Sequence, residues 1–266
     1  MKQRVRGIEI YHEIHGQGPR LLFIGGSGGD LRHKPGVFEG PLVQEFEVLS
    51  YDQRGLGRTD QPDGPYSMAD YGEDAAALLD AVGWDRCCVM GVSFGGMVAQ
   101  ELAARYPERV ERLVLACTSS GGKGKPSYPL HELQELPAGE RALRSMELSD
   151  LRRNAVWREA NPAEAAGALE FMKARAAAGA SEPGREEGFR LQLQARAGHD
   201  TWDRLAGLSM PVYLCGGHHD GIAPPANQHA MAGQIPNAKL ELFDGGHLFL
   251  MQDRSALPKI AEFLTG

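Results

Sequence analysis

The sequence Gly91-Val92-Ser93-Phe94-Gly95-Gly96 contains the pattern Gly-x-Ser-x-Gly. An apolar run, Cys87–Val92, leads into it and predicts a buried strand, and residues 97–106 lead out of it with the pattern of a helix. A serine on such a tight turn from strand to helix sits in a strained backbone and projects its hydroxyl clear of the sheet. The helix directs its positive end toward the serine and favours developing negative charge there. We therefore predict that Ser93 is a nucleophile.

Apolar runs alternate with helical patterns on both sides of this turn. The predicted strands are 8–15, 21–24, 46–52, 87–92, 112–118, 212–216 and 239–243, and the predicted helices between and after them are 67–82, 97–106 and 255–264. Most of these strands are apolar throughout, which suits parallel strands covered by helices on both faces. The alternation predicts an α/β fold with a mostly parallel, doubly wound sheet.

Residues 121–199 interrupt the alternation. They are rich in Ala, Glu and Arg, and they contain predicted helices at 140–151, 163–178 and 187–197. Residues 121–200 carry 12 basic and 12 acidic residues, whereas the whole chain has a formal charge of -7. We predict a core formed by residues 1–120 and 200–266, with residues 121–199 inserted as a helical lid over the site. A helical layer without a gating role is the alternative.

A serine hydroxyl is a weak nucleophile until a base takes its proton, and the base is expected after an acid in the chain order Ser, acid, His. The chain has nine histidines, and His247 alone follows the last predicted strand. The loop that holds His247 opens at the same end of the sheet as the Ser93 turn. We therefore predict that His247 is the base.

The acid is expected in the loop after the penultimate strand, residues 217–225. Asp220 is the only carboxylate in that loop, and the loop after strand 112–118 offers no acid. Its role is to accept a hydrogen bond from the imidazole and stabilise the imidazolium. Asp244, three residues before His247, is the alternative.

Two backbone N–H groups are needed to hold the oxyanion of an acyl-transfer reaction. Phe94, the residue after the nucleophile, supplies one of them. The other is expected from the loop Gly25-Gly26-Ser27-Gly28-Gly29-Asp30, whose small residues allow the backbone to approach a substrate. We assign this donor to Ser27, with Gly26 as the alternative.

The composition excludes several classes of function. The 42% of hydrophobic and 24% of charged residues are ordinary for a soluble globular protein. The net negative charge of the chain does not favour binding to nucleic acid or to an anionic membrane. No run of about 20 apolar residues and no signal peptide is visible. All four cysteines lie in apolar runs and are predicted to be packing residues, which favours a cytoplasmic location.

Other functional patterns fit less well. A nucleotide-binding loop after strand 21–24 would require a third glycine where the chain has Leu31. A metal site at His218-His219-Asp220 is disfavoured because adjacent side chains diverge, so no metal and no cofactor are expected. A non-catalytic, small-molecule-binding protein remains open. The same catalytic residues also serve C–C bond hydrolysis, perhydrolysis and acyl transfer, which the sequence does not separate.

The chain resembles the α/β-hydrolase superfamily over essentially its whole length. The resemblance is carried by the turn at Ser93, the loop Asp52-Gln53-Arg54-Gly55-Leu56-Gly57-Arg58-Thr59-Asp60, Asp220 with its following prolines, and Gly246-His247. Within the superfamily, the chain is similar to small esterases and to 3-oxoadipate enol-lactonase-like hydrolases. Many relatives carry His-Gly where this chain has Gly25-Gly26. The serine speaks against the haloalkane dehalogenase and epoxide hydrolase branches, in which the resemblance would place an aspartate.

The resemblance and the predicted residues together imply hydrolysis of a carboxylic ester or lactone through an acyl-serine intermediate. The expected partner is a small, mostly apolar substrate, without nucleic acid or membrane. Four aromatic residues of the predicted lid are candidates to line an apolar acyl pocket or are simple packing residues: Tyr128, Trp157, Phe171 and Phe189.

Overall fold

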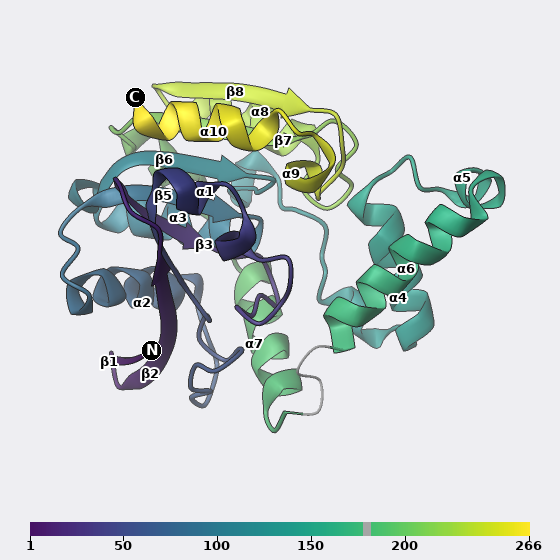
Figure 1. The fold of residues 1–266 in the computed structure, drawn as a ribbon, viewed down its shortest axis with the longest axis horizontal. Helices are drawn as coiled ribbons and strands as arrows, with labels where there is room; N and C mark the ends of the chain where they lie inside the picture. Colours follow the sequence, from purple (N-terminus) through teal and green to yellow (C-terminus); the bar gives the residue numbers. More distant parts are fainter. Residues whose placement is uncertain (178–181) are drawn as a thin grey trace.

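Eight strands form one sheet in the order β1-β2-β4-β3-β5-β6-β7-β8 (Figure 1). The computed structural model describes residues 1–177 and 182–266. The strands are Lys2–Val5 (β1), Ile8–His15 (β2), Arg20–Ile24 (β3), Glu47–Tyr51 (β4), Cys87–Val92 (β5), Val110–Ala116 (β6), Val212–Gly217 (β7) and Ala238–Phe243 (β8). β1 and β2 are antiparallel to their neighbours, and the other strands are parallel. The predicted doubly wound, mostly parallel sheet is confirmed.

Helices cover both faces of the sheet, as the apolar strands require. One face packs against α2 (Met68–Ala81), α3 (Phe94–Arg105), α7 (Arg185–Ala197) and α8 (Pro225–Gln234) in the larger hydrophobic core. The other face packs against α1 (Leu42–Glu45), α9 (Phe249–Gln252) and α10 (Ala256–Thr265) in a second cluster. Buried apolar area of this kind contributes roughly 25 cal/mol per Å² to folding.

The observed ends of most elements lie within three residues of the predicted ones, and two of the differences have identifiable reasons. Helix α3 begins at Phe94, three residues earlier than predicted, because Gly95 and Gly96 mask the helical pattern. Strand β6 ends at Ala116, since Cys117 turns the chain with a φ of 40°. Strand β1 and helices α1, α5 (Ala155–Ala160), α8 and α9 were not predicted, because they are short or lack a clear apolar pattern.

After β6 the chain enters residues 121–199, the segment that the sequence predicts to be an insertion. It contains η3 (Gly122–Gly124), η4 (Glu132–Glu135), α4 (Ala138–Ser149), α5 (Ala155–Ala160), α6 (Pro162–Ala177) and α7, and η5 (Trp202–Gly207) follows it. The predicted helix 163–178 corresponds to α6, and its expected last residue, Ala178, lies outside the described residues. A β-bridge between Gly121 and Asp200 joins the two ends of the insertion.

The helices of the insertion have different relations to the core. Helices α4, α5 and α6 lie together beside the sheet, at the right of Figure 1, and α6 packs on α4 and α5. Helix α4 contributes to a small separate cluster with Leu133 and Ile222. Helix α7 instead places Leu191 and Ala195 in the larger core.

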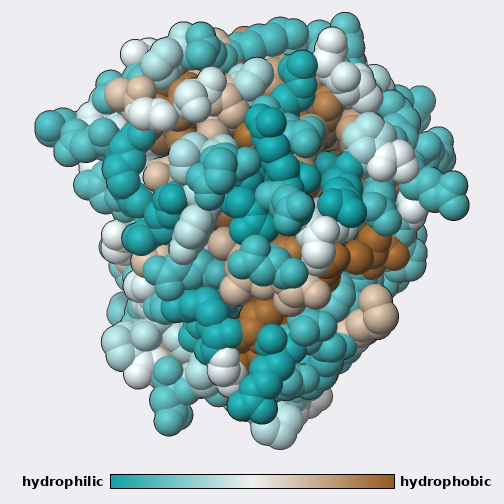
Figure 2. All heavy atoms as spheres, turned by 90° about the vertical axis from the view of Figure 1, so that its left-hand side faces the viewer, coloured by the Kyte–Doolittle hydropathy of each residue, from teal (hydrophilic) through white to brown (hydrophobic). Residues whose placement is uncertain are grey.

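The outer surface is largely polar where Figure 2 shows it, and hydrophobic residues reach that face only in patches. Among the described residues, no helix combines the length and the apolar character that crossing a membrane would require.

One buried histidine lies where the insertion joins the core. The ring of His199 is buried, and its Nε2 lies 3.5 Å from Thr201 Oγ1. Burial disfavours the charged imidazolium and lowers the pKa of His199 to about 4, although the Glu101 carboxylate acts in the opposite direction. The folded protein therefore keeps this histidine neutral at pH values where the unfolded chain protonates it.

Replacing His199 with Gln is expected to make the protein less sensitive to acid. Between the usual pKa of 6.5 and about 4, the unfolded chain binds a proton at His199 that the folded chain does not, so stability falls as the pH falls. At pH 4, the resulting loss in the free energy of unfolding amounts to about 3 kcal/mol. Urea unfolding of both proteins from pH 7.5 to pH 4 measures it.

The comparison is made between the two proteins at each pH. His12 also has a pKa lowered by burial, and because it is present in both proteins, its contribution cancels. Parallel stability curves for wild type and His199→Gln would contradict a buried neutral His199.

Candidate active site

Ser93 occupies the sharp turn between β5 and α3. Its backbone has φ 55° and ψ -116°, a region that is strained for a residue with a side chain. A Cβ atom on Gly95 would overlap the carbonyl oxygen of Ile24 in β3, so glycine is needed there. The Ser93 N–H donates to Ala116 O at 2.8 Å, and Thr118 Oγ1 donates to Ser93 O at 2.7 Å. The strained turn is therefore held by the end of β6 and by the residues that follow it.

The three residues predicted to form a catalytic group lie in one hydrogen-bonded chain. His247 Nε2 lies 2.9 Å from Ser93 Oγ, and His247 Nδ1 lies 2.7 Å from Asp220 Oδ2. Ser93 follows β5, Asp220 follows β7 and His247 follows β8, so all three stand at the carboxyl ends of parallel strands. This is the arrangement in which a histidine can take a proton from a serine while a carboxylate orients the ring.

The carboxylate of Asp220 is fixed from its other side. The side chain is buried, and Oδ1 accepts hydrogen bonds from the N–H groups of Ile222 at 2.7 Å and Ala223 at 2.9 Å. The alternative acid, Asp244, has a side chain that is 78% exposed and pairs with Arg152 at 2.8 Å. The geometry therefore favours Asp220 over Asp244 as the partner of His247.

The C-terminal end of α4 holds the two loops that carry Asp220 and His247. The carbonyl oxygen of Ser149 accepts the His247 N–H at 2.6 Å, and that of Leu148 accepts the Gly221 N–H at 2.9 Å. The Leu151 N–H donates to His219 O at 2.9 Å. The insertion is thus connected to both loops through backbone groups, which sequence patterns do not reveal.

The loop predicted to complete the oxyanion site lies against the nucleophile. A Cβ atom placed on Gly26 would be 3.5 Å from Ser93 Cβ, and the Gly29 N–H donates to Gly26 O at 3.1 Å to form a tight turn. Ser27 lies within this turn. Phe94 is the first residue of α3, where the backbone N–H groups lack acceptors within the helix. Its ring is buried, edge-on to Tyr71 at 4.9 Å between centroids.

Two buried glutamines and an arginine hold this loop in place. Gln53 Nε2 donates to Gly25 O at 2.8 Å, and Gln192 Oε1 accepts the Gly28 N–H at 2.8 Å. Arg185 also donates to Gly28 O at 3.3 Å. Gln192 and Arg185 belong to α7. The last helix of the insertion therefore supports residues 25–30, the predicted oxyanion loop. The sequence analysis missed Gln192 because it lies 164 positions from its partner.

The four aromatic residues proposed for an acyl pocket lie in different places. The ring of Phe189 covers Gly28, where an added Cβ atom would be 3.1 Å from Cε2. Tyr128 packs on the small cluster of α4. Trp157 lies on α5 below the Arg153 guanidinium, and Phe171 is half-buried on α6. They lie on separate segments of residues 121–199.

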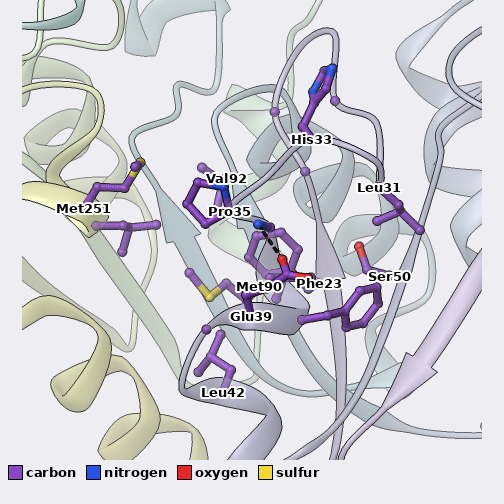
Figure 3. Close-up of a pocket in the computed structure, with 18 of the residues that line it drawn as sticks. Phe23, Leu31, His33, Pro35, Glu39, Leu42, Ser50, Met90, Val92 and Met251 are labelled. Atoms are coloured by element: carbon purple, nitrogen blue, oxygen red, sulfur yellow. Dashed lines mark hydrogen bonds between the residues drawn. The ribbon is translucent and has the colours of Figure 1, made fainter. Parts of the chain in front are cut away.

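A cavity of about 370 Å³ lies beside the site, on the α9 and α10 side of the sheet (Figure 3). Gly25, Gly26 and His247 line one end of it. None of the four aromatic residues of the insertion lines this cavity.

Cys117, Asp220 and His247 have potential metal-ligand atoms within 4.8 Å of one another. Thiols bind metals as thiolates, and burial raises the pKa of Cys117 well above its usual value, so this thiol stays protonated near neutral pH. Asp220 and His247 are already bonded to each other, and a metal would have to break that bond. Asp220 and His247 therefore suit the hydrogen-bonded chain to Ser93 better than they suit a metal site.

The comparisons with known proteins agree with this architecture. The family model described as alpha/beta hydrolase fold matches residues 19–253. A poly(3-hydroxyalkanoate) depolymerase of Ectopseudomonas oleovorans is 32% identical over 247 residues, covering 92% of this chain and 83% of that protein. The 3-oxoadipate enol-lactonase 2 of Acinetobacter baylyi is 26% identical, covering 92% of this chain and 87% of that protein.

A crystal structure gives the same result for the fold. The enol-lactonase from Burkholderia xenovorans matches with a TM-score of 0.81 and 23% identity, and the match covers 100% of both chains. Together with the family model, these relatives show that the chain belongs to the α/β-hydrolase fold family.

Proposed function

We propose that the protein is a serine hydrolase that cleaves a carboxylic ester or lactone of a small, mostly apolar substrate through an acyl-serine intermediate. The observation that carries this proposal is the hydrogen-bonded chain from Ser93 through His247 to Asp220. The relatives named as a depolymerase and an enol-lactonase support the ester and lactone class. No cofactor is needed for this reaction.

The mechanism follows from the positions of the polar atoms. Ser93 Oγ attacks the substrate carbonyl while His247 Nε2 takes its proton, and Asp220 keeps Nδ1 protonated and stabilises the imidazolium. The oxyanion of the tetrahedral intermediate is held by the N–H groups of Phe94 and Ser27. When the intermediate collapses, His247 gives the proton to the leaving alkoxide. Water then attacks the acyl-serine by the same route and releases the acid.

The insertion has a supporting role in this mechanism. We propose that residues 121–199 form a lid whose helices α4, α5 and α6 stand beside the site, while α7 and the end of α4 hold the catalytic loops. The lid contributes backbone and glutamine contacts and none of the three proposed catalytic residues.

Replacing Ser93 or His247 with Ala is expected to lower kcat on p-nitrophenyl acetate by about 10⁴-fold or more, because either change removes nucleophilic attack. The double variant is expected to lose no more than either single variant, since the residues act as a unit. Steady-state kinetics measure this, and a serine-reactive phosphonate is expected to label wild type at Ser93. Near wild-type activity in either variant would overturn the assignment.

Replacing Asp220 with Asn is expected to lower kcat by about 10⁴-fold, because the amide favours the wrong imidazole tautomer. Asp244→Asn is the matched control, and its kcat is expected to stay within a few-fold of wild type, since Asp244 is exposed and pairs with Arg152. The two variants are compared by kcat/KM at pH 8. The reverse ranking would assign the acid to Asp244.

Replacing Gln192 with Leu is expected to lower kcat by about tenfold or more with little change in KM. The change leaves the Gly28 N–H without its acceptor, and a displaced oxyanion donor stabilises the transition state less well while ground-state binding is kept. Gln194→Leu is the matched control, because Gln194 is exposed on the same helix. Thermal unfolding checks that both variants fold. Equal kcat in the two variants would show that Gln192 does not position the loop.

A further inference from the structure

The cavity beside the site lies within the core and not beneath the lid helices. It is bounded by the C-terminal ends of β3, β4 and β5, by the segment 31–42, and by the segment that follows His247. Its floor on the sheet is formed by Phe23, Ser50, Met90 and Val92 (Figure 3). His247 also lines the cavity, and its Nε2 lies 2.9 Å from Ser93 Oγ, so the cavity reaches the proposed catalytic residues.

The walls of the cavity are mainly apolar. Val37 and Phe38 come from the segment before α1, and Leu250 and Leu257 come from the opposite wall. All four side chains are half-buried, although each packs against the second hydrophobic cluster. Protein interiors are normally packed without such space, and an apolar cavity joined to reactive groups is the usual form of a ligand site.

The two carboxylates that line the cavity are already paired. Asp30 contacts Arg32 and Arg185, and Glu39 pairs with Lys34. These pairs leave no uncompensated charge to attract an ionic ligand. An uncharged ligand is therefore favoured over a carboxylate or a phosphate.

We propose that this cavity binds an uncharged aliphatic arm of the ester substrate, a proposal that rests on the proposed function. The arm enters past Gly26 and His247 and replaces water against Phe23, Met90 and Val92. Chain-length preference then depends on core residues. This differs from the expectation that the aromatic residues of the insertion select chain length, because none of them reaches the cavity.

Filling the cavity tests the proposal. Val37→Trp and Leu250→Trp narrow it from opposite walls, and Val156→Trp is the matched control, since Val156 is 75% exposed on α5. The measured quantity is the ratio of kcat/KM for p-nitrophenyl octanoate to that for p-nitrophenyl acetate. Each buried methylene contributes about fourfold to binding, so excluding two or more lowers this ratio by about tenfold or more. The control is expected to keep the wild-type ratio.

A second series identifies which arm of the ester occupies the cavity. If the acyl arm binds there, the cavity-filling variants lose discrimination between octanoate and acetate esters of p-nitrophenol. If the alcohol arm binds there, they lose discrimination between octyl and ethyl acetate instead. Unchanged ratios in both series, in variants shown to be folded by thermal unfolding, would overturn the proposal.

Binding without turnover separates this proposal from the proposed function. Calorimetric titration of Ser93→Ala with methyl octanoate is expected to show binding that is at least tenfold weaker in Ser93→Ala/Val37→Trp. If wild type hydrolyses no ester but this binding difference is found, the cavity assignment stands and the proposed reaction fails. If wild type hydrolyses esters through Ser93 and neither the kinetic ratios nor the binding changes, the cavity assignment fails alone.

Discussion

The strained backbone of Ser93 is the constraint on which the rest of the structure depends. Its positive φ places the hydroxyl above the sheet, and such strain persists only where the surroundings over-determine it. Strand β6 provides this support through the Ala116 carbonyl, and the segment after it does so through the Thr118 hydroxyl. Gly95 brings α3 so close to the end of β3 that the oxyanion loop must begin beside the nucleophile. One turn thereby fixes the relative positions of two loops from distant parts of the sequence.

Most of the sheet and all three proposed catalytic residues could be predicted from the sequence, because their signals are local. An apolar strand, a glycine-bounded serine and a helical pattern are adjacent in the chain around Ser93. Asp220 and His247 each follow a recognisable strand, and parallel strands end at one edge, which brings them together. The edge strand β1 was not predicted, because its residues Lys2-Gln3-Arg4-Val5 include a single apolar side chain and so lack an apolar strand pattern.

The supporting contacts could not be predicted, because they depend on how the insertion folds back. Gln192 meets Gly28 only when α7 packs into the larger core, and nothing in the residues around Gln192 indicates that contact. The hydrogen bond from the His247 N–H to the Ser149 carbonyl cannot be predicted from the sequence, since any residue at position 149 has a carbonyl group. Pattern reasoning finds side chains that carry chemistry, whereas backbone acceptors and buried amides appear only in three dimensions.

The insertion therefore combines two physically different parts. Helix α6 has no buried residue among its described side chains, so it can change position at small cost in buried apolar area. Helix α7 and the end of α4 cannot do so, because their movement would break hydrogen bonds to the oxyanion loop and to His247. In the proposed lid, α6 can therefore change position while the catalytic atoms keep theirs. The cavity proposed to bind an aliphatic arm is lined by no residue of 121–199, so the proposed chain-length selection does not depend on the position of α6.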